Sequence, residues 1–339
     1  MRPFAYEPVT TTAAALQAAA GGQGPSMLQS PVHFLAGGTT LIDLMKLDVM
    51  RPTTLIDINA LVGADLGHID VSRNGLRLGA LVRMAEAADH PDINHDFPVV
   101  AQSLKLAASQ QLRNMASLGG NVLQRTRCPY FRDVSYSDCN KRNPGSGCAA
   151  MDGFNRTHAV LGVSDNCIAT YPGDFAQALI ALDASVEIAG ARGTRIIPFA
   201  ALHRRPGDAP DIETTLQPGE MITSFLVAPG PWTRRSLYLK VRDRKSYEFA
   251  LASAAVALDL SDGIVRNARI ALGGVATVPW RASDAEAVLK DEPINDETKK
   301  AAAAAAFASA SARQHNRFKI ELGQRTLMQA LEQTATMEI

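Results

Sequence analysis

The chain has 339 residues, which exceeds the usual size of one domain, so we expect two or three subdomains around a large buried interior. Lys plus Arg and Asp plus Glu both total 34, and no basic run supplies a local positive field, which argues against nucleic acid as a partner. The start, MRPFAYEPVT, contains neither a secretory signal nor a twin-arginine element, and no apolar run is long enough to span a bilayer. These features predict that the chain by itself is soluble and cytoplasmic.

The first 58 residues are expected to form a compact α/β subdomain. Apolar periodicity predicts four elements in chain order: a helix over 12–20, a strand over 32–36, a helix over 41–46 and a strand over 55–58. Gly37 and Gly38 mark the turn between the strand over 32–36 and the helix over 41–46.

A middle unit of mixed helices and short strands is expected next. Its pattern predicts a strand over 76–78, a helix over 98–112, a helix over 175–181 and a strand over 185–189. Residues 125–166 stand apart, because RTRCPYFRDVSYSDCNKRNPGSGC is polar, rich in Asn, Ser, Gly and Pro, and has neither hydrophobic period. A loop of this length in a compact domain is usually functional or disordered.

The last third of the chain is expected to form strands followed by helices. Alternation predicts strands over 236–242, 252–260 and 264–273, and the pair Asp262-Gly263 predicts a tight hairpin between the last two. The chain closes with an alanine-rich helix opening at Asn295 or Asp296 and a second helix that carries Ile320, Leu322 and Leu327. We find no internal repeat.

All four cysteines lie close together in the sequence, in the polar stretch and directly after it: Cys128, Cys139, Cys148 and Cys167. This grouping favours a shared metal site over two disulfides or thiols without a role. The spacing C-x10-C-x8-C-x18-C lacks the short C-x2-4-C pairs of structural zinc sites and the C-x2-C spacing of ferredoxins. The residues favour an iron–sulfur cluster with zinc as the alternative, and they leave the choice between [4Fe–4S] and [2Fe–2S] open.

Two glycine-rich turns are candidates for binding a phosphate. The first is LAGGTTL at residues 35–41, and the second is SLGGN at residues 117–121. Glycine permits close approach of the backbone, whose amides can bind a pyrophosphate. Each turn alone is often only a turn, but two of them in separate subdomains can close on one dinucleotide. Neither has the G-x-G-x-x-G fingerprint of a Rossmann fold.

The order of motifs resembles the FAD-binding subunits of the xanthine dehydrogenase and carbon monoxide dehydrogenase family. The resemblance covers nearly the whole chain except residues 125–166, and it is carried by F-x-Y, AGGT-x-L, MK, QLRNMASLGGN, YPGDFAQALIALDA, YLKVRDRKSYEFALASAAVAL and LGGVATVPWR. It implies an α+β fold in which two α/β subdomains clasp FAD and a C-terminal sheet-and-helix domain follows. The implied boundaries are 1–58, 59–228 with a cysteine-bearing insertion at about 125–167, and 229–339.

The resemblance also implies which residues hold the FAD pyrophosphate. The role maps onto the two loops: Ala36, Gly37, Gly38, Thr39, Thr40 and Leu41 in the first, and Ser117, Leu118, Gly119, Gly120 and Asn121 in the second. The family commonly has Asp where this chain has Thr40, whose hydroxyl can still donate to a phosphate.

Three further residues match family positions near the ribityl and flavin end of FAD: Asp174, Ile222 and Lys240. The alternative for Asp174 is an N-cap of the helix that follows it, and both roles are compatible. The alternative for Lys240 is a solvated lysine at a strand edge. No residue of the chain is expected to be catalytic, because the flavin carries the chemistry.

A cysteine-bearing insertion at this place resembles the flavin subunits of bacterial periplasmic aldehyde oxidoreductases, which implies a [4Fe–4S] cluster on the four cysteines. His158 is a weaker candidate ligand, since four cysteines are available. Arg125, Arg127 and Arg132 flank the first cysteine and either balance the charge of a cluster, bind a partner subunit, or belong to a solvated loop.

The function implied is that of an electron-transfer subunit in a molybdenum-containing aldehyde or related oxidoreductase. Its partners are a small subunit with [2Fe–2S] clusters, a large subunit with the molybdenum cofactor, and an external electron acceptor. The alternatives are the flavin subunit of a xanthine, CO or hydroxybenzoyl-CoA hydroxylase, a zinc-stapled scaffold without flavin, and a stand-alone FAD-dependent reductase. Export of the assembled complex by a signal on the small subunit favours the periplasm over the cytoplasm.

Overall fold

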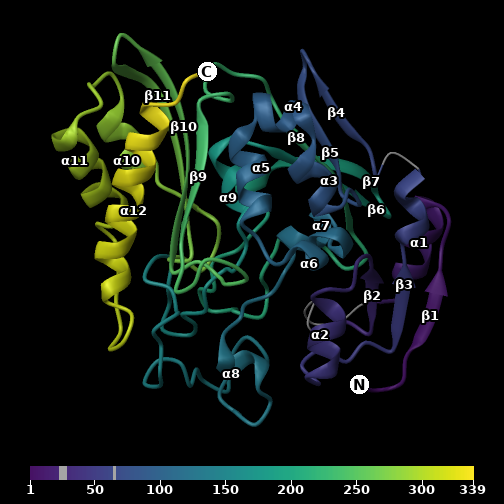
Figure 1. Ribbon diagram of the computed structural model, residues 1–339. Helices are drawn as coiled ribbons and strands as arrows, with labels where there is room; N and C mark the ends of the chain where they lie inside the picture. Colours follow the sequence, from purple (N-terminus) through teal and green to yellow (C-terminus); the bar gives the residue numbers. More distant parts are fainter. Residues whose placement is uncertain (23–28, 64–65) are drawn as a thin grey trace.

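The computed structural model describes residues 1–22, 29–63 and 66–339 of the protein. Its strands form three sheets that follow one another along the chain, and helices pack against each of them (Figure 1). The N-terminal sheet lies at the right of that view, the C-terminal sheet at the left, and the middle sheet with its helices between them. This arrangement confirms the α+β fold class. No helix within the described ranges is long and apolar enough to cross a membrane.

The N-terminal sheet is parallel, with the order β1 (Ala5–Pro8), β3 (Thr54–Asp57), β2 (Val32–Leu35). Parallel neighbours require crossover connections, and helices α1 (Thr12–Ala19) and α2 (Leu41–Lys46) lie in these connections. The 3-10 turn η2 (Asn59–Gly63) follows β3. The first glycine turn therefore leaves the carboxyl end of β2, an edge at which α/β sheets commonly bind ligands.

The middle sheet is antiparallel and has the order β4-β5-β8-β6-β7. Its strands are β4 (Ile69–Ser72), β5 (Gly75–Gly79), β6 (Ser185–Gly190), β7 (Gly193–Pro198) and β8 (Met221–Val227). The helices of this part are α3 (Met84–Asp89), α4 (Pro91–Asp96), α5 (Pro98–Lys105), α6 (Gln110–Met115), α7 (Leu118–Val122) and α9 (Phe175–Ala181), with the 3-10 turn η3 (Phe199–Ala201). Fully buried Phe175, Phe199 and Phe225 meet edge to face in the core between them.

The single helix predicted over 98–112 is wrong, because the chain breaks there into α5 and α6. Ala108 has a φ of 50°, which a helix cannot continue through. Ser109 then starts α6, since its hydroxyl accepts a hydrogen bond of 3.3 Å from the amide of Leu112. The apolar periodicity continues across this break and does not reveal it, whereas Ser109 is a residue type that commonly caps a helix.

The C-terminal sheet is an antiparallel meander of β9 (Ser236–Val241), β10 (Ala252–Ser261), β11 (Ile264–Gly273) and β12 (Trp280–Arg281). The expected hairpin turn is confirmed, with φ values of 52° at Asp262 and 76° at Gly263, as a type I′ turn requires. Helices α10 (Ser283–Leu289), α11 (Asp296–Ala306) and α12 (Phe318–Ala335) cover one face of the sheet. Helices α5 and α9 of the middle part contact the other face (Figure 1).

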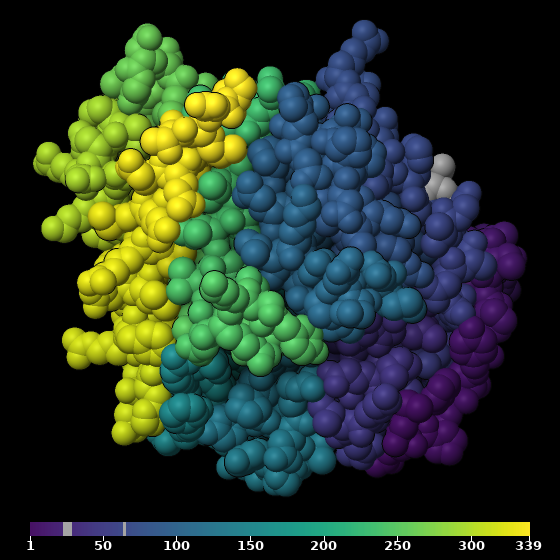
Figure 2. All heavy atoms as spheres, viewed as in Figure 1, coloured from purple at the N-terminus to yellow at the C-terminus, as the bar shows by residue number. Residues whose placement is uncertain are grey.

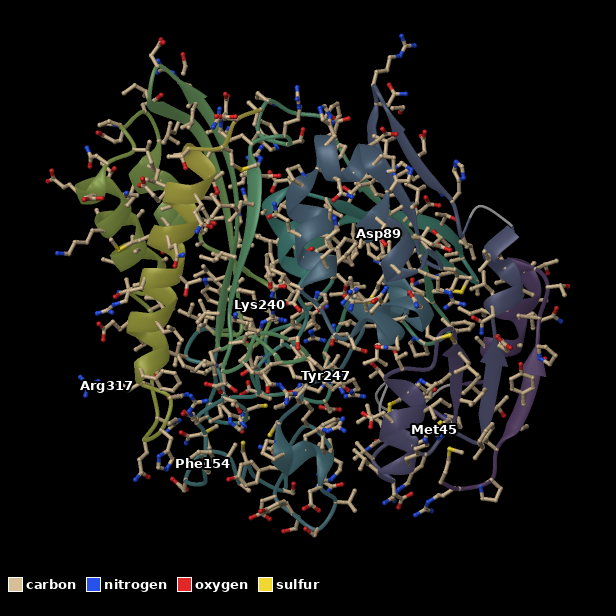
Figure 3. All side chains as sticks on the ribbon, in the orientation of Figure 1. Met45, Asp89, Phe154, Lys240, Tyr247 and Arg317 are labelled. Atoms are coloured by element: carbon tan, nitrogen blue, oxygen red, sulfur yellow. The ribbon has the colours of Figure 1, made fainter. Side chains whose placement is uncertain are left out.

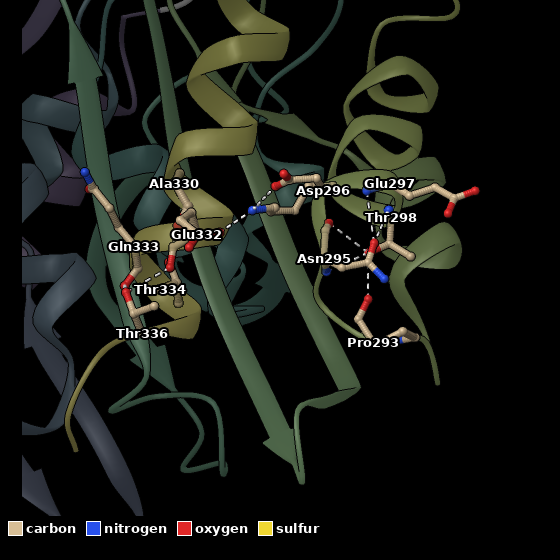
Figure 4. A network of polar contacts seen from close by, with 11 residues as sticks. Pro293, Asn295, Asp296, Glu297, Thr298, Ala330, Glu332, Gln333, Thr334 and Thr336 are labelled. Atoms are coloured by element: carbon tan, nitrogen blue, oxygen red, sulfur yellow. Dashed lines mark hydrogen bonds and ion pairs between the residues drawn. The ribbon is translucent and has the colours of Figure 1, made fainter.

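Helix α11 begins where the sequence indicated and is tied to α12. The side chain of Asn295 caps it, accepting from the amides of Glu297 and Thr298 at 3.0 Å each (Figure 4). Lys299 pairs with Asp296 on its own helix and with Glu332 on α12. These contacts fix the outer helical layer.

The cysteine-bearing segment is an irregular layer in which the short helix α8 (Pro129–Arg132) lies. In the space-filling view it forms the lower edge of the molecule, between the N-terminal and C-terminal parts (Figure 2). Lys319 of α12 is fully buried and anchors it, donating to the carbonyls of Thr157 and His158 at 3.1 Å each and of Gly274 at 2.5 Å. The long loop is therefore a packed part of the structure.

Replacing Lys319 by Met is expected to lower the free energy of unfolding by about 3 kcal/mol, because three buried carbonyls lose their donor. Lys300→Met on the exposed side of α11 is the matched control and is expected to change it by less than about 0.5 kcal/mol. Urea unfolding followed by circular dichroism measures both. Equal stabilities of the two variants would contradict the anchoring role of Lys319.

Candidate functional site

The two glycine turns touch each other in the structure. The first follows β2, and the second forms α7 with Ser117 as its cap, whose hydroxyl accepts from the amide of Gly120 at 3.2 Å. A Cβ atom on Gly37 would lie 2.0 Å from the carbonyl oxygen of Met115, just before the second turn. Only glycine permits this approach, so position 37 fixes how closely the N-terminal and middle sheets come together.

A polar bridge that the sequence did not reveal holds the two turns in register. The guanidinium of Arg83 donates to the carbonyl of Met115 at 2.5 Å and to the side-chain oxygen of Asn59 at 2.9 Å. Asn59 in turn donates to the carbonyl of Ala36 at 3.0 Å. The second turn is also bound to the middle sheet, since the amide of Gly119 donates to the carbonyl of Ala80 at 2.8 Å. These hydrogen bonds therefore hold both turns in position.

One pocket opens between the turns and contains most of the residues expected to bind FAD. From that set it is lined by Ala36, Gly37, Gly38, Thr39, Thr40, Leu41, Ser117, Gly119, Gly120 and Ile222. Sequence reasoning missed Glu213, Thr214, Leu216, Glu220 and Met221, which also line it. Arg125 is the only Lys or Arg among the described lining residues, and none of the three roles considered for it placed it in this pocket.

The remaining expected residues lie outside this lining. Leu118 is fully buried in the core of the middle part. The amide nitrogen of Asn121 lies 3.3 Å from the sulfur of Met84, and its side-chain oxygen is buried without a hydrogen-bond partner among the described residues. A buried acceptor of this kind fits a site that a ligand completes.

Asp174 and Lys240 bind each other in the interior, where Lys240 is labelled in Figure 3. Their side chains are 5% and 1% exposed, and the Lys240 ammonium lies 2.8 Å from the Asp174 carboxylate and 3.0 Å from the carbonyl of Leu106. Tyr238 donates to the other carboxylate oxygen at 2.6 Å. Burial raises the pKa of Asp174 despite these partners, with Lys240 acting in the opposite direction.

The simpler alternatives for these two residues are wrong. Asp174 occupies the N-cap position of α9, but its carboxylate makes no capping hydrogen bond. Lys240 is a buried member of an ion pair and not a solvated lysine. A buried charge pair of this kind is costly unless its partners are well placed, which the contacts with Tyr238 and Leu106 provide.

All four cysteines line one small cavity, and all four thiols are free, so the disulfide alternative is wrong. Cys139 and Cys148 are paired through their backbones, which brings the ends of the second spacing together. Within the described residues, no three His, Cys, Asp or Glu side chains are arranged to hold a single metal ion. The four thiols thus surround a common cavity, but they are not close enough to one point to bind a single metal ion.

Burial is the main influence on these thiols. It raises the pKa of Cys128 to about 12 and that of Cys167 to about 11, and it also raises the pKa of Cys148. The Nε2 atom of His158 lies 3.1 Å from the sulfur of Cys128. Burial lowers the pKa of His158 to about 4, so at neutral pH its ring is uncharged. In the free state the thiols of Cys128 and Cys167 and the ring of His158 therefore carry no charge at neutral pH.

The three arginines near the first cysteine make specific ion pairs, so a plain solvated loop is wrong. Arg125 lies 2.7 Å from the carboxylate of Glu213. Arg132 and Arg127 lie 2.7 and 3.4 Å from the carboxylate of Asp43 on α2, and these contacts, with Arg132 foremost, hold the pKa of Asp43 below its usual range despite partial burial. The segment is thereby joined to the N-terminal part.

Comparisons with known proteins assign the two halves of the chain. Residues 2–229 match the family described as the FAD binding domain in molybdopterin dehydrogenase, and residues 237–334 match the CO dehydrogenase flavoprotein C-terminal domain. The chain is 46% identical over 335 residues, 98% of both chains, to the aldehyde oxidoreductase FAD-binding subunit PaoB of Escherichia coli K12. It is 26% identical over 263 residues, 78% of this chain and 75% of the relative, to the glyceraldehyde dehydrogenase medium chain of Sulfolobus acidocaldarius.

Among solved structures, the chain matches a carbon monoxide dehydrogenase from Hydrogenophaga pseudoflava with a TM-score of 0.73 and 25% identity, over 98% of this chain and 96% of that one. The fold and the paired glycine turns define a flavin-binding subunit of an oxidoreductase. More particularly, the chain belongs to the molybdopterin dehydrogenase FAD-binding family with the CO dehydrogenase flavoprotein C-terminal domain. It is an FAD-dependent electron-transfer subunit, and the alternative of a scaffold without flavin loses its support.

In the metal-free protein, Cys128 and Cys167 are expected to react with iodoacetamide at pH 8 at least about 100 times more slowly than in the unfolded chain. The reason is that their pKa values of about 12 and about 11, against an ordinary 9.0, leave little thiolate. Mass spectrometry of the alkylated peptides over time measures the rates, with the chain in urea as control. Equal rates in the folded and unfolded protein would contradict the buried, protonated state of these two thiols.

Proposed function

We propose that FAD binds in the pocket between the two glycine turns, with the pyrophosphate at residues 36–41 and 117–121. The observation that carries this is that residues of both turns line one pocket, beside the close approach of Gly37 to Met115. Arg125 adds a cation to the wall of the pocket. When bound, FAD accepts electrons singly from iron–sulfur centres and passes two to an acceptor.

The inner residues then orient the flavin end. Ile222 would supply an apolar wall, and the buried pair of Asp174 and Lys240, which lies outside the lining, would supply a fixed, compensated charge. The carbonyl of Leu106 and the hydroxyl of Tyr238 hold that pair in place. A preorganised pair of this kind resists the rearrangement that a change of charge on a neighbouring group would otherwise cause. The low exposure of both side chains, 5% for Asp174 and 1% for Lys240, supports a rigid pair.

The substrate of the whole complex is proposed to be an aldehyde. Two relatives support this by name, the aldehyde oxidoreductase subunit PaoB and the glyceraldehyde dehydrogenase medium chain. The partners are then a small [2Fe–2S] subunit and a large molybdenum subunit, with an external electron acceptor. We place the assembled complex in the periplasm, with the cytoplasm as the alternative, and divide the chain at residues 58 and 228. The three successive sheets support that division.

We further propose that Cys128, Cys139, Cys148 and Cys167 hold a [4Fe–4S] cluster. All four line one cavity, and the imidazole of His158 is close enough to donate a hydrogen bond to a sulfur ligand. Zinc remains the alternative, but it requires ligands that converge on a single ion. Because the thiols are protonated when free, ligation releases protons and is favoured by rising pH.

Gly37→Ala is expected to weaken FAD binding by about tenfold or more, because the new Cβ would collide with the Met115 carbonyl and separate the two turns. Gly63→Ala is the matched control, since a Cβ there meets nothing within 4 Å. Flavin absorbance per chain and fluorescence titration of the deflavinated complex measure the effect. Undiminished FAD content in Gly37→Ala would refute the assignment of this pocket.

Cys139→Ser is expected to abolish iron binding, whereas Ser135→Ala in the same segment leaves it unchanged. The native protein should contain about four irons and four acid-labile sulfides per chain beyond those of partner subunits. Iron, sulfide and zinc assays on anaerobically purified complex, with absorption spectra, measure this. One zinc per chain without sulfide would replace the cluster by a zinc site and leave the FAD proposal standing.

A further inference from the structure

Three charged side chains, of which Arg125 and Lys141 are buried and Glu213 is partly buried, connect the glycine-turn pocket and the cysteine cavity. The carboxylate of Glu213 accepts from the ammonium of Lys141 at 2.8 Å through one oxygen and lies 2.7 Å from the guanidinium of Arg125 through the other. Arg125 and Glu213 line the pocket proposed for FAD. Lys141 lines the cysteine cavity. One carboxylate therefore connects a cation at each site.

Burial makes this link more than a surface ion pair. The side chains of Arg125, Lys141 and Glu213 are 7%, 10% and 26% exposed. Burial alone would raise the pKa of Glu213, but Arg125 and Lys141 together hold it below its usual value. Removing one member leaves the others uncompensated in a medium where charges are costly. The three side chains must therefore be ordered together.

A second contact runs parallel to the first. The guanidinium of Arg125 lies 5.3 Å from the ring centroid of Phe131, which is fully buried and also lines the cysteine cavity. In the chain, Phe131 follows Cys128 by three residues and Lys141 follows Cys139 by two. Ligation of these two cysteines would immobilise both segments that position Arg125 and Glu213. Between the two sites lie Lys141, Cys167 and Glu213, which line a common small cavity.

We propose that Lys141, Glu213 and Arg125 are positioning residues that couple occupancy of the cysteine cavity to FAD binding. The inference rests on the proposed function, since it requires a cluster in one site and FAD in the other. A bound cluster would restrict the motion of Lys141 and Phe131. Through their contacts with Glu213 and Arg125, these two residues would hold the guanidinium of Arg125 in its position in the flavin pocket. Linkage makes the effect reciprocal, so that bound FAD also stabilises the cluster.

The test uses the purified complex, with its FAD removed or restored to saturation, and follows iron release to a chelator. In the unaltered protein, FAD is expected to slow the release of the cysteine-cavity iron by about tenfold. In Lys141→Met and in the isosteric Glu213→Gln, saturating FAD is expected to lose this protective effect on the cavity iron. Lys141→Arg keeps the charge and is expected to retain most of it. Two variants at different positions keep the test valid if one fails to fold.

Arg156→Met is the matched control, because Arg156 lies in the same segment but pairs with Asp243 at an exposed position. It is expected to leave the FAD effect intact. Protection that persists in both Lys141→Met and Glu213→Gln, or that is absent from the unaltered protein, would overturn the coupling. A complex that lacks FAD or cavity iron altogether would instead contradict the proposed function, and the coupling with it.

Discussion

The close contact of Gly37 with the backbone of Met115 is the constraint on which the rest of the site depends. It sets the distance between a parallel sheet at the N-terminus and an antiparallel sheet in the middle, and a pocket forms where the two turns diverge. Arg83 and Asn59 hold the contact from behind, through carbonyl groups that would otherwise lack donors. A pocket lined by glycine turns from two different sheets therefore arises without a Rossmann fingerprint.

The sequence was most informative where local chemistry decides the structure. The Asp262-Gly263 hairpin and the helix capped by Asn295 follow from turn and cap preferences that act over a few residues. The break at Ala108 was missed because apolar periodicity continues across it. The paired glycine turns, too, were visible as motifs, while their contact was not. The family resemblance implied that both turns bind one cofactor. The hydrogen bonds of Arg83 and Asn59 that connect the turns became visible only in the structure.

Long-range charge pairs lay beyond sequence reasoning. From the local sequence, Lys240 resembles a surface lysine and Asp174 a helix cap. The two residues are 66 positions apart, so no local pattern indicates that they form a buried ion pair. Glu213 lies in a stretch without periodicity and drew no attention, although it joins Arg125 to Lys141. The segment that carries the cysteines meets every part of the protein: Asp43 on α2, Glu213 in the middle part and Lys319 on α12. The sequence of this segment has no helical or strand periodicity. Its ordered structure could not be predicted locally, because contacts with residues far away in the chain stabilise it.

The alanine-rich strand β10 has a consequence for how the protein unfolds. Its small residues, such as Ala254 and Ala255, are fully buried on opposite faces, and they belong to the two different hydrophobic cores on either side of the sheet. Helices α5 and α9 approach from one side and α12 from the other. Separating the C-terminal part from the rest would expose the hydrophobic core of the middle part to solvent. We therefore expect the two parts to unfold in one cooperative transition and not as separate units.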